Sequence, residues 1–274
     1  MAAIPLEDNY TDVVGKAQRG LRLSDSELAK LAGVSASELG HFKGGGFDLE
    51  TARKVAGPLN LGAGALIELG QKSWQPAPIE VAGLAAFNTP YQDMTVNSFI
   101  VFDSKALLAA AFDTGATCAG MLEFIKQQQL TVAGIFLTHS HPDHVADLKR
   151  LQTETGAEVH IGENESLHGP KPFPAGEVFR VGTLKIETRQ TSGHARGGIT
   201  YVVTGLERRV AVVGDALFAA SMGGGAVSYE EALRTNRREI FSLPDDTVIC
   251  PGHGPMTTVG EQKKHNPFYP EFQK

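Results

Sequence analysis

Four side chains that could bind metal ions lie within six residues of this 274-residue sequence: His139, His141, Asp143 and His144. They follow the apolar run at 134–137, which predicts a strand. In an extended chain, residues two apart face the same side, so the first two histidines can bind one metal ion together. The turn at Pro142 directs the last two side chains towards a neighbouring ion. This density of ligand side chains is typical of a metal site rather than of a protein core.

Three further candidate ligands each follow a glycine where an expected strand meets a turn: Gly193-His194, Gly214-Asp215 and Gly252-His253. Glycine lets the backbone turn tightly and approach a crowded centre closely, which explains its place beside ligands. A set of imidazoles and carboxylates without a thiolate suits zinc, which is the ion we expect, and is also compatible with iron or manganese. The sequence therefore predicts a site for two divalent metal ions.

The elements that must hold these ligands alternate between strand-like and helical segments from residue 81 onward. Apolar runs typical of strands precede His139, Asp215 and His253, and another such run follows His194. Helices are expected at 116–129, 145–155, 229–241 and 259–265. This mixture predicts an α/β sandwich in which helices cover the sheets and the loops at strand ends carry the chemistry.

The first part of the chain differs, because residues 1–72 carry only helix signals. Ser24 with Glu27, and Ser35 with Glu38, have the spacing of capping boxes at helix starts. The segment 25–45 is similar to the helix-turn-helix of phage-repressor-type domains. We therefore predict a small all-α, helix-turn-helix-like domain at 1–72, a proline-containing linker at 73–78, and a catalytic α/β domain at 79–274.

Charge and composition narrow the partners of this protein. The net charge of −6 gives no general attraction to nucleic acid or to anionic membranes. The second helix of the helix-turn-helix-like segment offers only His41 and Lys43 as basic side chains, so nucleic acid is not an expected partner. We expect instead an interaction or dimerisation module that supports a homo-oligomer. The N-terminal residues lack a secretion signal and no segment has transmembrane length, which predicts a cytoplasmic protein that does not bind membranes.

The motif at 139–144 resembles, residue for residue, the His-x-His-x-Asp-His motif of the metallo-β-lactamase superfamily. The resemblance spans residues 79–270 and implies an αββα sandwich behind the small all-α domain. It implies that one metal ion is bound by His139, His141 and His194. It implies that a second ion is bound by Asp143, His144 and His253. By the same resemblance Asp215 bridges both ions. The stretches GDALFAASMGG, LPDDTVICPGHGPMTTVG and KKHNPFYP are similar to glyoxalase II-like hydrolases.

This resemblance implies a binuclear metallo-hydrolase that cleaves a small-molecule thioester or ester with a metal-activated hydroxide, which Asp143 could orient. Two alternatives stay open at this point. One is a mononuclear iron persulfide dioxygenase, whose ion would be held by His139, His194 and Asp215. The other is a DNA-binding or ligand-sensing protein that acts through its N-terminal domain. The complete ligand set favours an enzyme, because a sensor could lose ligands without harm.

Overall fold

The computed structural model describes residues 4–273 and begins with five helices. These are α1 (Tyr10–Gly20), α2 (Asp25–Ala32), α3 (Ala36–Lys43), α4 (Leu49–Ala56) and α5 (Ala63–Gln71). Both predicted capping boxes are confirmed: the Ser24 and Ser35 side chains accept hydrogen bonds from the third helical residue, whose glutamate binds back to the cap backbone. Gly33, with φ of 63°, ends α2 in the left-handed conformation that glycine adopts easily.

Two six-stranded sheets follow. The first contains, in spatial order, β1 (Leu84–Tyr91), β2 (Met94–Asp103), β3 (Leu108–Phe112), β4 (Thr131–Leu137), β5 (Val159–Gly162) and β6 (Lys171–Phe173). The second runs from β12 (Thr257–Thr258) through β11 (Val248–Pro251), β10 (Val210–Gly214), β9 (Ile199–Thr204) and β8 (Leu184–Gln190) to β7 (Val178–Val181). Pairing is parallel from β3 to β6 and between β10 and β11, and antiparallel elsewhere.

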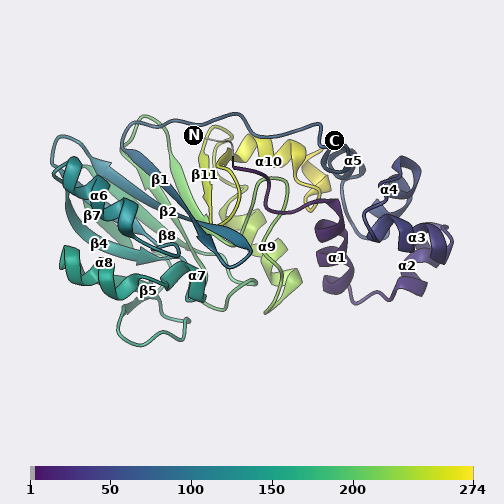
Figure 1. Ribbon diagram of the computed structural model, residues 1–274, viewed down its shortest axis with the longest axis horizontal. Coiled ribbons are helices and arrows are strands. Elements are labelled where there is room, and N and C mark those ends of the chain that lie inside the picture. Colours follow the sequence, from purple (N-terminus) through teal and green to yellow (C-terminus); the bar gives the residue numbers. More distant parts are fainter. Residues whose placement is uncertain (1–3, 274) are drawn as a thin grey trace.

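The sheets pack face to face and helices cover both outer faces (Figure 1), so the predicted αββα sandwich is confirmed. Side chains from both sheets, such as Phe112, Tyr201 and Val212, fill the space between them. The first sheet is covered by α6 (Ala119–Gln127) and α8 (Leu148–Thr155). The second is covered by α9 (Tyr229–Glu239) and α10 (Val259–His265), and the short helix η1 (Pro270–Phe272) follows.

The helix predicted at 145–155 is wrong at its start. The chain instead forms a one-turn helix, α7 (Pro142–Val145), and begins α8 only at Leu148. Between them Asp147 leaves the helical conformation, with φ of −115° and ψ of 23°. Its carboxylate accepts a hydrogen bond from the backbone N–H of Cys118 at 3.0 Å, and its own N–H donates to the Thr114 hydroxyl. These tertiary contacts break the helix that the local pattern favours.

The N-terminal helices share one continuous apolar core with the outer face of the second sheet. This core joins Val13 and Val14 of α1 to Val213 of β10 and Ile240 after α9, all of them buried. Figure 1 shows α1 and α5 next to the sandwich and α2 to α4 farther away. Burial of such side chains stabilises the contact by about 1.5–3 kcal/mol each. The N-terminal helices are therefore packed on the sandwich through a shared apolar core.

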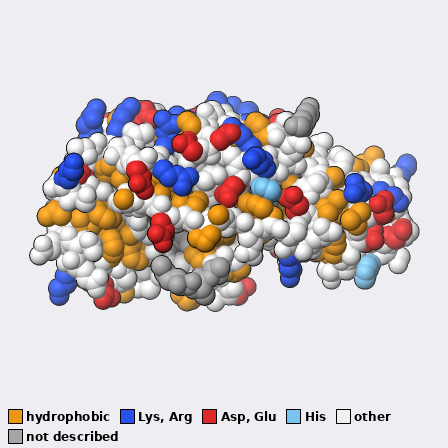
Figure 2. Space-filling model, turned by 90° about the horizontal axis from the view of Figure 1, so that it is seen from above, with side chains coloured by type: hydrophobic (Ala, Val, Ile, Leu, Met, Phe, Trp, Pro, Cys, Tyr) orange, Lys and Arg blue, Asp and Glu red, His pale blue; other side chains and the backbone are white. Residues whose placement is uncertain are grey.

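Residues 73–81, between α5 and β1, form neither helix nor strand. They nevertheless lie on α10, because Trp74 stacks on His265 with ring centroids 4.4 Å apart. Figure 2 shows acidic and basic side chains interspersed over the visible face of the N-terminal helices, unlike the continuous basic surface typical of nucleic-acid-binding domains. None of the helices within residues 4–273 combines the length and apolar character needed to span a bilayer.

Candidate metal centre

The first candidate ligands follow β4 directly, as expected. Thr138, the residue after this strand, donates from its backbone N–H and its hydroxyl to the two carboxylate oxygens of Asp113, both at 2.7 Å. This anchor sets the direction of the chain as it enters the motif. Pro142 then starts α7, whose turn redirects the chain. His139 and His144 are buried, and the two ligand residues between them are partly exposed.

The other three candidates come from loops at the ends of the second sheet. His194 precedes β9, Asp215 follows β10, and His253 follows β11. The expected role of glycine is clearest at Gly252, where a Cβ atom would overlap a carboxylate oxygen of Asp215 and lie 2.6 Å from His144 Cε1. Only glycine lets these two ligand loops approach each other so closely.

The structure brings all seven predicted residues together in two groups that could each hold a metal ion. The first group is His139, His141, His194 and Asp215, and the second is Asp143, His144 and His253. In each group one ligand atom per residue lies within 4.8 Å of all the others. The carboxylate of Asp215 faces both groups: Oδ1 lies 3.2 Å from His144 Nε2, and Oδ2 lies 3.4 Å from His194 Nε2.

Unused polar atoms show that these residues fit metal binding. His139 Nε2, His144 Nε2 and Asp215 Oδ1 are buried and have no hydrogen-bond partner among residues 4–273. Orphaned buried polar atoms are costly, so atoms of this kind that face a common centre indicate a missing charged partner. The donor set of imidazoles and carboxylates is the set that zinc, iron and manganese bind.

Hydrogen bonds orient three of the imidazoles, those of His144, His194 and His253, so that Nε2 faces the centre. The Nδ1 atom of His144 donates to Asp113 at 2.8 Å, that of His194 to the carbonyl of Gly224 at 3.0 Å, and that of His253 to the carbonyl of Thr95 at 2.7 Å. Because Nδ1 carries a proton in each of these rings, Nε2 is the atom that can bind a metal ion; in His194 it lies 3.0 Å from His141 Nδ1. Partners of this kind fix the tautomer and ring orientation of metal-binding histidines.

Burial and neighbouring charges shift the pKa values of the histidines in this cluster. Burial alone lowers the pKa of His144, but the carboxylates of Asp113 and Asp215 outweigh burial and raise it to about 10. Burial likewise lowers the pKa of His253, and hydrogen bonds with Asp143 and Asp215 raise it to about 11. The pKa of His139 falls below its ordinary value because of burial and the charge of His144. Protons therefore occupy part of the cluster in the absence of metal ions.

Sequence reasoning missed two carboxylates that hold the ligand loops. Asp113, at the end of β3, orients both Thr138 and His144, and only its position after a strand could have signalled this role. Glu165 accepts hydrogen bonds from the backbone N–H of Ser140 at 2.9 Å and of Gly197 at 2.7 Å. It thereby ties the motif loop to the loop of His194, and no pattern in the sequence marks it.

The segment before α1 also reaches the centre. Gly254, the residue after the last candidate ligand, packs so closely on Glu7 that a Cβ there would lie 3.1 Å from Glu7 N. Burial raises the pKa of the Glu7 carboxyl. The neighbouring Asp8 pairs with Lys16 of α1 and accepts a hydrogen bond from the Ser221 hydroxyl. Helical and sandwich parts of the chain thus meet beside the candidate ligands.

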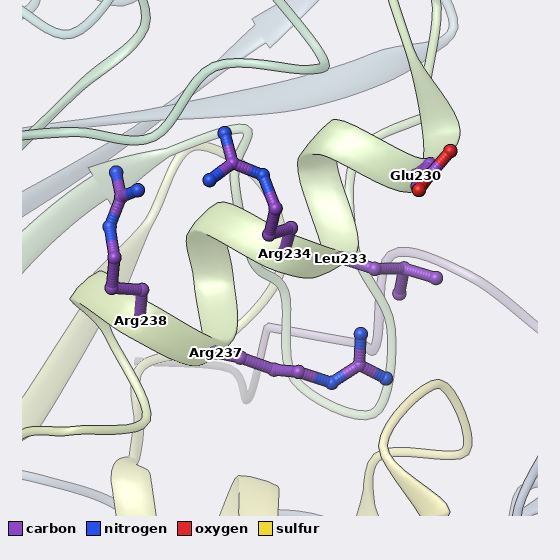
Figure 3. A pocket seen from close by; sticks show the side chains of 5 residues that line it. All are labelled: Glu230, Leu233, Arg234, Arg237 and Arg238. Carbon is purple, nitrogen blue, oxygen red and sulfur yellow. The ribbon is translucent and has the colours of Figure 1, made fainter.

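A separate cavity of about 490 Å³ lies on the surface of α9 and is lined by none of the candidate ligands. Figure 3 shows Arg234 and Arg238 pointing to one side of this helix and Arg237 to another. Each arginine has an acidic partner in the structure: Glu231, Glu239 and Glu271 respectively. This cavity is therefore a solvated ion-paired surface rather than part of the metal centre.

Comparison with known proteins agrees with this geometry. The family model of the metallo-beta-lactamase superfamily matches residues 93–253. The chain is 28% identical over 216 residues to the hydroxyacylglutathione hydrolase GloC of Haemophilus influenzae, covering 69% of this chain and 97% of that protein. It is 28% identical over 200 residues to a probable metallo-hydrolase of Bacillus subtilis, covering 64% and 92%. The crystal structure of ETHE1 from Myxococcus xanthus has the same fold, with a TM-score of 0.60, 24% identity, and coverage of 68% and 85%. The chain therefore belongs to the metallo-β-lactamase superfamily.

Proposed function

We propose that this protein is a binuclear metallo-hydrolase that cleaves a small-molecule thioester or ester. The observation that carries the proposal is the position of Asp215, whose carboxylate lies within 3.5 Å of His194 Nε2 in the first ligand group and of His144 and His253 Nε2 in the second. The second group of Asp143, His144 and His253 offers ligands for a second ion. The similarity to a hydroxyacylglutathione hydrolase supports a thioester as the substrate class.

His139, His141 and His194 would hold one ion, Asp143, His144 and His253 the other, and Asp215 would bridge them. When bound, two divalent ions, for which zinc is our proposal, would lower the pKa of a bound water towards about 7 and would polarise the acyl carbonyl. In the hydrolysis, the water oxygen bonds to the acyl carbon, the carbon–sulfur or carbon–oxygen bond breaks, and the leaving group takes up a proton that this water releases, which gives a carboxylic acid and a thiol or alcohol.

Asp143 is the residue to which we assign a catalytic role besides metal binding. Its side chain is 13% exposed and its Oδ2 lies 3.2 Å from His253 Nε2. Burial raises the pKa of this carboxyl, but the hydrogen bond with His253 and the charge of His144 outweigh burial and lower it. An ionised Asp143 can accept a hydrogen bond from the attacking water and so orient it towards the acyl carbon.

The two cysteines are unsuited to act as nucleophiles. Both are buried, and burial together with the Asp147 carboxylate raises the pKa of the Cys118 thiol to about 12. Burial also raises the pKa of Cys250. A thiol attacks as its thiolate, which these environments disfavour. Attack by water is therefore the route that the described residues support.

The test combines elemental analysis of protein purified without added metal with turnover assays on the same sample. We expect close to two equivalents of metal per chain and hydrolysis of a hydroxyacyl thioester of glutathione or an acetyl thioester of a small thiol. Asp143→Asn should lower kcat at least about 100-fold, whereas Asp147→Asn, four residues away and outside both groups, should not. One equivalent of iron with persulfide-dependent oxygen uptake would replace the proposal with a dioxygenase.

A further inference from the structure

A second cavity lies where α1 meets the loop between β10 and α9. Its volume is about 330 Å³ and it is lined by Lys16, Arg19 and Gly20 of α1, the loop residues 224–226, and Tyr229 of α9. This size is at the lower end of the range for small-molecule sites, so the cavity suits part of a substrate rather than a whole cofactor. Close packing forms one wall, because a Cβ at Gly20 would overlap the Tyr229 ring.

The loop that lines this cavity is bonded directly to two candidate metal ligands. The carbonyl of Gly224 accepts the hydrogen bond from His194 Nδ1 at 3.0 Å. The backbone N–H of Gly223 donates to the carbonyl of Asp215 at 3.1 Å. The loop that lines the cavity is therefore hydrogen-bonded to His194 through Gly224 and, one residue earlier in the chain, to Asp215 through Gly223.

The cavity has an excess of positive charge, and it comes from Arg19. The Lys16 ammonium is already occupied: it pairs with Asp8, donates to the carbonyl of Met222 at 2.9 Å and lies 5.3 Å from the centre of the Phe218 ring. The Arg19 side chain is exposed, and its guanidinium has no hydrogen-bond or acidic partner in the described part of the chain. Its guanidinium lies along α1 over Gly15, where an added Cβ would be only 3.0 Å from Nη1.

Backbone donors complete the lining. The N–H groups of Gly224 and Gly225 donate no hydrogen bond within residues 4–273. A guanidinium and unpaired backbone N–H groups in the lining of one cavity form a combination that recognises anions, and the planar fork of arginine matches the two oxygens of a carboxylate.

We propose that this cavity is a subsite for a carboxylate on the leaving group of the substrate, bound by Arg19 of the N-terminal helices. The proposal rests on the proposed hydrolase function. It gives the N-terminal helices a direct part in substrate selection, because the only cation of this cavity without a partner in the described residues comes from α1.

The test compares two acetyl thioesters that differ only in charge: that of 3-mercaptopropionate and that of its neutral amide. In the Arg19→Gln variant, the ratio of kcat/KM for the anionic over the neutral thioester should fall about tenfold, the loss expected for a charged hydrogen bond near solvent. Arg19→Lys should retain part of the ratio. Arg53→Gln removes the same charge from α4, which does not line the cavity, and should leave the ratio as in the wild type.

A binding measurement separates this proposal from the proposed hydrolase function. Isothermal titration with the unreactive thioether 3-(methylthio)propionate should show weaker binding to Arg19→Gln than to the wild type, again by about tenfold. If neither thioester is hydrolysed but binding still depends on Arg19, the subsite stands and the thioesterase function is wrong. If binding and the kcat/KM ratio both stay within twofold in Arg19→Gln, the subsite proposal is wrong.

Discussion

Asp113 provides a sharp test of how the metal centre is built, because it touches a candidate ligand without belonging to either ligand group. Its Oδ2 accepts the proton of His144 Nδ1 at 2.8 Å, which leaves Nε2 free to bind a metal ion. In Asp113→Asn the amide oxygen can still accept the hydrogen bond from the Thr138 N–H. The amide NH₂ then faces His144 Nδ1 and favours the other tautomer, whose proton sits on Nε2. Metal binding through Nε2 then requires the ring to give up this hydrogen bond, whereas the Asp113 carboxylate stabilises the form with a proton on Nδ1 that binds the ion.

The expected effect is a 10- to 100-fold loss of affinity for one metal ion, the usual cost of losing a carboxylate behind a ligating histidine. This range corresponds to about 1.4–2.7 kcal/mol. The ion bound by His139, His141 and His194 should keep its affinity. A competition titration of metal-free protein with a chromophoric zinc chelator resolves the two affinities.

Asp103→Asn is the matched control for this experiment. Asp103 also binds both the backbone N–H and the hydroxyl of one threonine, Thr183, at 2.9 and 2.7 Å, but it contacts no candidate ligand. It should reduce stability without changing either zinc affinity. Near-ultraviolet circular dichroism establishes that both variants are folded. Two unchanged zinc affinities in folded Asp113→Asn would refute the orientation argument.

Three further outcomes follow from the geometry. Gly252→Ala should lose more than half of its metal by elemental analysis, because a Cβ would overlap Asp215 and crowd His144; full metal content would contradict this. Zinc binding to metal-free protein at pH 7 should release about two protons in titrations that compare buffers, because the pKa values of His144 and His253 are raised to about 10 and 11. Since these pKa values exceed the ordinary 6.5, protonation of the two histidines stabilises the metal-free fold fully below pH 6.5, and this stabilisation is lost as pH rises through 10 to 11. Zinc affinity should increase over the same range, because fewer protons must be displaced. Zinc binding without proton release would contradict both statements. Phe42→Ala removes a fully buried ring and should lower the free energy of unfolding in urea by about 3–5 kcal/mol. The N-terminal helices and the sandwich should still unfold in one transition. A separate early transition would show that the helices unfold alone.

The candidate ligands could be predicted because their chemistry is concentrated in the sequence. Four of them occur within six residues, and the other three stand beside glycines that end or precede apolar runs. The α/β sandwich could be predicted from the same runs, since short apolar segments that alternate with helical ones are typical of α/β proteins, and the αββα arrangement was implied by the family resemblance. Asp113 and Glu165 could not be predicted in this way. Their roles depend on contacts with residues 25 to 32 positions away, and such contacts leave no local pattern.

The packing partner of the N-terminal helices could not be predicted from the sequence either. Their capping boxes specify where α2 and α3 begin, but an amphipathic helix does not specify what covers its apolar face. The sequence favoured a module that interacts with other molecules, and that role stays a prediction. In the structure Val13 and Val14 lie in a core that includes the second sheet, so much of the apolar surface is already covered by the same chain.

This packing explains why a division into a helical part and a catalytic part is incomplete as a description of function. Asp8 links Lys16 of α1 to Ser221, which lies six residues beyond Asp215 in the chain. The same stretch of chain continues to Gly224, whose carbonyl orients His194. A shift of α1 would therefore displace the chain segment that follows Asp215 and that orients His194. No residue of α1 itself belongs to either ligand group. The N-terminal helices and the metal centre should be treated as one functional unit.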